Sequence, residues 1–199
     1  MHGSECGPVS GEHAIRFLLP ETGGHSKTMI LKRFFQSSTL PVRPLYEAIV
    51  AAARRPVAYA EWGVPDTLDG RFDMIALHMF LVLNRLKGED RAFRQELVDE
   101  FFRDMDRSLR ELGVGDLSVG KKVRKMAEAF YGRLAAYDKA LAGSAAELDE
   151  TLSRNIYPDG APSSGLAALA AHVRKTRESL AAKAAADIMS ARAVFEEGV

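Results

Sequence analysis

Residues 71–88, RFDMIALHMFLVLNRLKG, are the stretch that decides the fold. Apolar side chains cover nearly the whole circumference of a helix built from residues 71–87, and a helix that is apolar all round is buried. Gly88 is a typical residue to end such a helix. Asp69 or a neighbour can cap its start by accepting free backbone N–H groups. The stretch therefore predicts a central, buried helix.

Amphipathic segments flank this stretch on both sides and are predicted to pack against it. On the N-terminal side, Pro41 and Pro44 introduce a helix that Pro56 ends. On the C-terminal side, Asp90 can cap a helix that ends before Gly113. Its apolar residues fall at alternating three- and four-residue steps and form one stripe: Phe93, Leu97, Val98, Phe101, Met105, Leu109 and Leu112.

Three further helices complete the prediction. Ser118 precedes a fourth helix, and Ser144 with Glu147 forms a capping box for a short fifth helix. The loop PDGAPSSG at 158–165 leads to a long Ala-rich helix that reaches Phe195. No run shows the alternation of a strand flanked by turn residues. The predicted fold class is therefore all-α, an irregular bundle of about five to six helices with a long C-terminal helix.

The domain organisation follows from these segments. Residues 1–40 are expected to be a poorly ordered tail, and the natural start could be Met29, which opens the phrase MILKRFF. Residues 41–157 form the predicted helical domain, and residues 158–199 form a loop and the Ala-rich helix. Packing of that helix on its own bundle is the default, and pairing with another chain is the alternative.

The composition and the motifs exclude several function classes. The chain has 27 basic and 27 acidic residues, a balance that argues against a dedicated DNA-binding protein. It contains no Glu-x-x-His pairs of a di-iron bundle, no G-x-S-x-G elbow and no phosphate-binding glycine loop. His78 lies on an otherwise apolar helix, where a core histidine is far more common than a metal ligand. We therefore predict no enzyme, no metal and no cofactor.

Two segments are candidates for binding. Lys121, Lys122, Arg124 and Lys125 crowd the first turns of the fourth helix, where positive charge opposes the helix dipole. The cluster could contact ribosomal RNA or anionic lipid, although a role in solubility is the stronger alternative. MILKRFF could also lie at a membrane surface, but it is short.

The other candidate is the loop from Tyr59 to Gly70, which carries the only tryptophan, Trp62. Aromatic side chains with a polar end suit both folded corners and partner surfaces. Composition alone favours the structural interpretation, in which the loop folds back and caps the core. The functional interpretation is that it presents an aromatic anchor. Arg71 and Asp73 are predicted to form a local charge network.

Two longer motifs, GVPDT-x-x-GRFDM at 63–74 and FFRDMDRSLRE-x-GVGDL-x-V-x-K at 101–121, resemble the ubiquinol–cytochrome c chaperone family. The resemblance covers about Pro44 to Leu141 and leaves the C-terminal helix unmatched. It implies an assembly factor for ubiquinol–cytochrome c reductase. Mitochondrial members bind newly made cytochrome b and work with a small partner near the ribosomal tunnel exit.

The resemblance places the candidate client or partner contacts in the aromatic loop, at Tyr59, Trp62, Asp66, Asp69 and Arg71. No mitochondrial presequence is recognisable, so we expect a bacterial member in the cytoplasm, or held peripherally at the inner face of the cytoplasmic membrane. Its partners would be cytochrome b or another subunit of the reductase, with the ribosome as a further candidate. The alternative function is a helical binding protein for an apolar ligand such as quinone or haem, with His78 lining the pocket.

Overall fold

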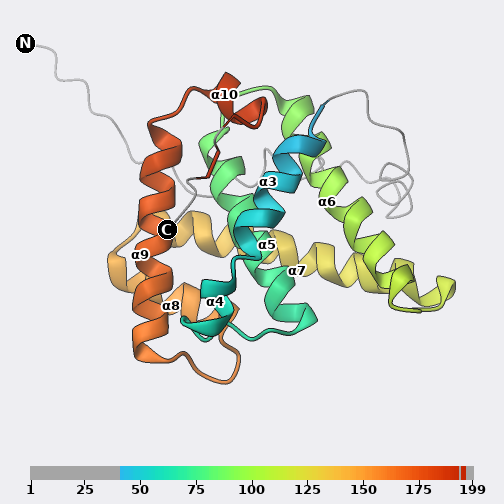
Figure 1. The fold of residues 1–199 in the computed structure, drawn as a ribbon, viewed down its shortest axis with the longest axis horizontal. Helices are drawn as coiled ribbons and strands as arrows, with labels where there is room; N and C mark the ends of the chain where they lie inside the picture. The colour runs from blue at the N-terminus through green and yellow to red at the C-terminus, as the bar shows by residue number, and fades with distance from the viewer. Residues whose placement is uncertain (1–40, 193, 196–199) are drawn as a thin grey trace, which may run out of the picture.

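The computed structural model describes residues 41–192 and 194–195, and in these ranges the chain contains helices and no strand (Figure 1). The helices are α3 (Arg43–Ala53), α4 (Pro56–Ala60), α5 (Leu68–Arg85), α6 (Arg91–Glu111), α7 (Asp116–Ala142), α8 (Ala145–Ile156), α9 (Ser163–Ala181) and α10 (Ala185–Met189). The predicted all-α class is confirmed. The predictions for residues 1–40, including Met29 and MILKRFF, lie outside the described residues.

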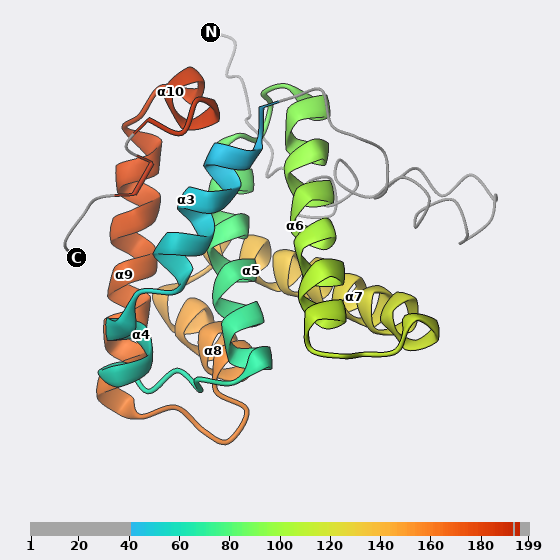
Figure 2. The same cartoon turned by 45° about the vertical axis from the view of Figure 1, so that its right-hand side comes forward.

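Helix α5 is the centre of the bundle, as its sequence predicts. It packs against α3, α7, α8 and α9, and every residue from Phe72 to Leu83 is buried (Figures 1 and 2). The helix begins three residues earlier than the apolar run suggests, because Thr67 is the cap. The Thr67 hydroxyl accepts a hydrogen bond from the Gly70 N–H at 3.1 Å, while Asp69 lies inside the first turn.

The space between α5, α6 and α7 is filled by aromatic rings. Phe101 of α6 lies 5.7 Å from Phe72 of α5 and 4.9 Å from Phe130 of α7, measured between ring centroids. Phe101, Phe102 and Phe130 all have zero exposure. Burial of three such side chains contributes several kcal/mol to folding, so this cluster holds the three helices together.

Two predicted caps are present. The Asp90 carboxylate accepts hydrogen bonds from the backbone of Ala92 and Phe93 at the start of α6. Ser144 and Glu147 form the capping box of α8. Helix α7 begins at Asp116, three residues before the predicted start at Val119, and Gly115 rather than Ser118 stands at its N-cap.

The predictions of the first helix end and of the C-terminal helix need correction. Pro56 ends α3, but it also opens the short helix α4, because proline fits the first position of a helix. A long helix, α9, is present in the C-terminal region, but its predicted extension to Phe195 is wrong, since α9 ends at Ala181 and α10 follows after a break. Arg85 of α5 donates hydrogen bonds to the carbonyls of Leu180 at 3.0 Å and Lys183 at 2.5 Å, which hold the end of α9. As expected by default, α9 packs on its own bundle, against α5 and α8.

None of the described helices has both the length and the apolar character needed to cross a membrane.

Candidate functional site

The loop between α4 and α5, residues 61–67, is anchored on its inner side by Trp62. The indole ring lies 5.1 Å from the imidazole of His172 on α9, and the side chain is partly buried against the core. The hydroxyl of Tyr157 donates a hydrogen bond to the Trp62 carbonyl at 3.0 Å. The structural interpretation of Trp62, which composition favours, therefore fits its position.

Two glycines allow the backbone of the loop to lie close against α5 and α9. A Cβ atom on Gly165 would lie 2.0 Å from the Trp62 carbonyl oxygen, and one on Gly70 would lie 2.0 Å from the Pro65 carbonyl oxygen. No side chain fits at such a distance, so both positions require glycine. The loop is consequently held against both α5 and α9.

The outer side of the loop borders an open hollow of about 540 Å³. Tyr59 is half-buried, and its hydroxyl donates a hydrogen bond to the Ala53 carbonyl at 2.9 Å. Burial raises the pKa of Tyr59 above its usual value. Arg71 pairs with Asp66 at 2.6 Å, and this bond lowers the pKa of the Asp66 carboxyl. The hollow is lined by Arg54, Pro56, Tyr59, Ala60, Asp66 and Arg71.

The structure thus brings together three of the five predicted contact residues, Tyr59, Asp66 and Arg71. Trp62 instead contacts α9 on the inner side, and Asp69 is exposed in the first turn of α5. The predicted network of Arg71 with Asp73 is wrong. Asp73 is buried and pairs with Arg133 of α7 at 2.7 Å, because its side chain points into the bundle.

A buried histidine pair lies behind Trp62. His78 has zero exposure, and its Nε2 atom is 3.2 Å from Nε2 of His172. The other ring nitrogen, Nδ1, is 2.8 Å from the Met74 carbonyl, so it donates there. Burial lowers the pKa of His78 to about 3 and that of His172 to about 4. Both rings are therefore neutral at pH 7, and because His78 carries its proton on Nδ1, the Nε2–H of His172 donates the hydrogen bond to Nε2 of His78.

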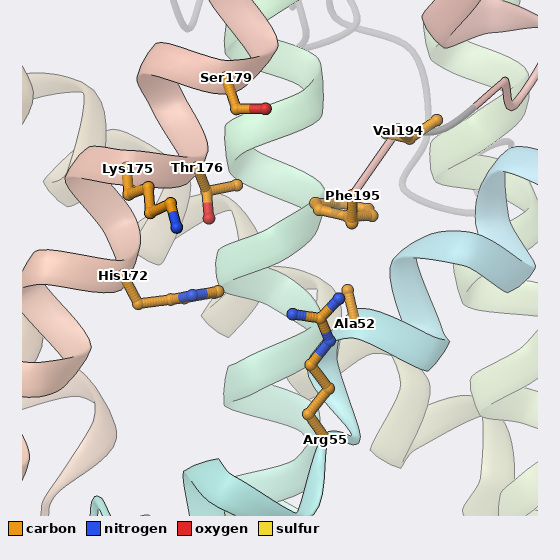
Figure 3. A pocket seen from close by; sticks show the side chains of 8 residues that line it. All are labelled: Ala52, Arg55, His172, Lys175, Thr176, Ser179, Val194 and Phe195. Atoms are coloured by element: carbon orange, nitrogen blue, oxygen red, sulfur yellow. The ribbon is translucent and has the colours of Figure 1, made fainter. Parts of the chain in front are cut away.

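Figure 3 shows the hollow beside His172, to which Arg55, Lys175 and Phe195 also contribute. Its cavity of about 20 Å³ has room for roughly one water molecule. Both ring nitrogens of His78 are engaged, and the hollow is far too small for haem or a quinone. No group of three histidine, cysteine or carboxylate side chains that could hold a metal occurs within the described residues.

The predicted basic cluster lies on another part of the surface. Lys121, Lys122, Arg124 and Lys125 are all exposed on α7. Leu112, assigned to the buried stripe of the third helix, is 64% exposed. Leu109 is the last buried residue of α6, and Leu112 follows as the C-cap of that helix, directly before the turn at Gly113.

Sequence reasoning missed Arg54, Pro56 and His172. The run Arg54-Arg55-Pro56 contained a signal, since two cations before a proline were interpreted only as a helix end. His172 carries no local signal, because its partner Trp62 is distant in sequence and only the fold brings them together.

These features define an all-α protein whose candidate site is a surface beside a loop that is held in place by its own packing. A protein of this class is suited to binding a partner. A sequence model of the family described as "Ubiquinol-cytochrome C chaperone" matches residues 60–195. The chain belongs to this family. The match includes α8, α9 and α10, so the C-terminal region, which the motifs left unmatched, is part of the family pattern.

Two known proteins are similar to this chain. The crystal structure of the Cbp3 homolog from Brucella abortus is 42% identical, has a TM-score of 0.68, and the match covers 83% of this chain and 90% of that one. Ubiquinol-cytochrome-c reductase complex assembly factor 1 from Xenopus laevis is 27% identical over 101 residues. That match spans 49% of this chain and about half (50%) of the length of the Xenopus protein.

Proposed function

We propose that this chain is an assembly chaperone for ubiquinol–cytochrome c reductase, that it binds newly made cytochrome b, and that it performs no catalysis. The observation that carries the proposal is the family match over residues 60–195, which includes most of the bundle. The Xenopus relative, whose name describes an assembly factor of this complex, supports the same role. We place the chaperone in the bacterial cytoplasm or at the inner face of the cytoplasmic membrane.

The client-binding surface in this proposal is the hollow beside the α4–α5 loop. It offers an aromatic wall from Tyr59 and two guanidinium groups, Arg54 and Arg71. Arg71 pairs with Asp66 at an exposed position, where an ion pair contributes little to stability and is readily exchanged. A carboxylate of the client could therefore replace Asp66 at Arg71 with little loss to the fold.

The loop is suited to this role because it is fixed before the client arrives. Tyr59 is held by the Ala53 carbonyl, and Trp62 is held by His172 and Tyr157. A surface that needs no ordering on binding retains more of its interaction free energy as affinity. In this arrangement Trp62 supports the surface, while Tyr59 and Arg71 contact the client, and Asp69 lies just outside the hollow.

The test is recovery of cytochrome b with the tagged full chain from cells that express it. Arg71→Glu inverts one charge of the exposed pair with Asp66, and Arg154→Glu does the same to the exposed pair with Glu150. We expect Arg71→Glu to lower recovery by about tenfold, a cost of about 1.4 kcal/mol, and Arg154→Glu to leave it unchanged. Equal recovery with both variants would exclude this surface, and no cytochrome b with the wild-type chain would exclude the function.

For Lys121, Lys122, Arg124 and Lys125 we propose contact with an anionic surface. Ribosomal RNA is one such surface, and it would be recovered in the same experiment. Loss of ribosomal RNA from a Lys121→Gln, Lys125→Gln variant, with cytochrome b retained, would assign the cluster to the ribosome.

A further inference from the structure

Among the described helices, the turn between α6 and α7 lies at the end of the bundle away from α9 (Figures 1 and 2). Figures 1 and 2 both show it at the far end of α7. Two leucines flank the turn, Leu112 with 64% and Leu117 with 100% of their surface exposed. Side chains this exposed contribute little to the core. Single exposed leucines are common on protein surfaces, and these two become informative because a cluster of basic residues follows them. We refer to residues 112–125 as the α6–α7 tip.

The basic cluster continues from the same tip. Leu117, Lys121 and Lys125 are spaced by four residues and therefore share one face of α7, and Arg124 lies beside them. The opposite face carries Val119 and Val123, which are buried in the core. The exposed face thus combines an apolar end with a band of positive charge.

Acidic groups near the tip weaken this charge only in part. Asp116 is bound by Arg110 at 2.5 Å, and Arg110 also pairs with Asp106 at 2.7 Å. Glu111 and Glu128 are exposed at the two ends of the region. Between them, the four cations Lys121, Lys122, Arg124 and Lys125 follow one another with only Val123 intervening, and that residue is buried.

We infer that the α6–α7 tip docks on an anionic lipid bilayer. Leu112 and Leu117 would enter the boundary between headgroups and acyl chains, and the four cations would bind lipid phosphates. Basic residues near an anionic membrane each raise binding by about fivefold, and salt weakens the effect. The inference rests on the anionic contact proposed above for the basic cluster and names lipid as the anionic surface. Docking by this tip leaves the α4–α5 hollow free, so it does not depend on the proposed client-binding role.

The chemistry favours lipid over the other partners. Single-stranded RNA is recognised largely by stacking on aromatic rings, and the two exposed apolar side chains at this tip are aliphatic. A second copy of the chain would bring two clusters of the same positive charge together, which is repulsive. An anionic bilayer supplies both an apolar layer, for the leucines at the end of the tip, and negative charge, for the cations that follow along α7.

The experiment is flotation of the purified full chain with phosphatidylcholine vesicles, with and without phosphatidylglycerol. We expect binding only to the anionic vesicles and a decrease at high salt. Lys121→Gln with Lys125→Gln, and separately Leu112→Ser with Leu117→Ser, should each lower binding by about tenfold or more.

The control variants make the same kinds of substitution, loss of positive charge or of an exposed leucine, at positions outside the α6–α7 tip. Lys139→Gln with Arg177→Gln removes the same charge from exposed positions, and Leu68→Ser removes a leucine that is 51% exposed beside the other loop. Both controls should bind within about twofold of the wild type. Tip variants that bind like the wild type, controls that lose equally, or a wild-type chain that ignores anionic vesicles would each overturn the inference. Recovery of cytochrome b is measured separately, so either proposal can fail alone.

Discussion

The two loops that carry the candidate surfaces differ in what their residues contact. In the α4–α5 region, Gly70 and Gly165 each face a backbone carbonyl so closely that an added Cβ would lie 2.0 Å from it. In the α6–α7 tip, an added Cβ on Gly113, Gly115 or Gly120 would meet no other part of the described chain within 4 Å, apart from adjacent residues and the backbone of its own helix. The first region is therefore fixed by its own packing, whereas the second leaves open space at its glycines.

Their apolar side chains differ in the same way. Trp62 lies on His172 and is partly buried, whereas Leu117 is 100% exposed. An aromatic residue in a loop can thus stabilise the fold, whereas an exposed leucine at the start of a helix is available to contact a partner. Mutations at the inward contacts of the first region should change stability, whereas mutations of the exposed side chains of the second should change association with little effect on stability.

The largest expected effect is that of Gly165→Ala. The new methyl group would collide with the Trp62 carbonyl, which is also the acceptor for Tyr157. Backbone must move to relieve a contact of this kind, so we expect a loss of about 4 kcal/mol in the free energy of unfolding, measured by urea denaturation. Gly120→Ala in the tip is the matched control, and it should stabilise α7 by about 0.5 to 1 kcal/mol. Equal effects at the two glycines would contradict the comparison.

Trp62→Ala should cost less, about 3 kcal/mol, because its ring is only partly buried. The variant loses the contact with His172 and leaves a gap between the loop and α9. The urea midpoint gives the stability, and circular dichroism confirms that the helices persist at low denaturant. A midpoint equal to that of the wild type would mean that the ring is a surface anchor without a structural role.

The histidine pair predicts a third, smaller effect that depends on pH. Burial lowers the pKa of His172 to about 4, below the value of about 6.5 for an unfolded histidine. As the pH falls from 6.5 towards 4, the unfolded chain therefore binds a proton that the native chain does not, and stability decreases. His172→Gln should flatten this dependence by up to about 2 kcal/mol over the interval.

The measurement is the free energy of unfolding of both proteins across this pH range. Burial raises the pKa of Asp73 to about 7, so protonation of this group favours the native chain as the pH falls, opposite to the effect of His172. Both proteins contain Asp73, and its contribution therefore cancels in the difference between their free energies of unfolding. Identical slopes would show that His172 is solvated in the native state, and the contact between the loop and α9 would then be loose.

The sequence predicts those parts of the fold that depend on local chemistry. The apolar run of α5, the Asp90 cap and the Ser144–Glu147 capping box are each encoded within a few residues, and all three are present. The end of α9 is different, because residues 182–184 favour continuation of a helix. Arg85, far away in sequence, binds the carbonyls there and ends it.

The candidate site shows the same division. Tyr59, Asp66 and Arg71 are close in sequence, and they line one hollow; their contact with a client stays a prediction. Trp62 faces inward because His172, distant in sequence, lies against its ring. The periodicity assigned Leu112 to the apolar stripe, but a periodic pattern does not say which positions of the stripe other helices cover, and Leu112 is exposed. Contacts between distant segments decide which side of a loop is exposed, and one-dimensional patterns do not contain them.

The smallest expected effect on stability belongs to Leu112→Ser with Leu117→Ser. Both side chains are mainly solvated, so their loss removes almost no buried surface, and the free energy of unfolding should stay within about 0.5 kcal/mol of the wild type. Leu109→Ala, one turn earlier and 3% exposed, provides the contrast and should cost about 3 kcal/mol. Urea denaturation of the three proteins measures all of this. If the double variant were destabilised as strongly as Leu109→Ala, the tip leucines would be part of the core, and the reason to expect a membrane beneath them would be lost.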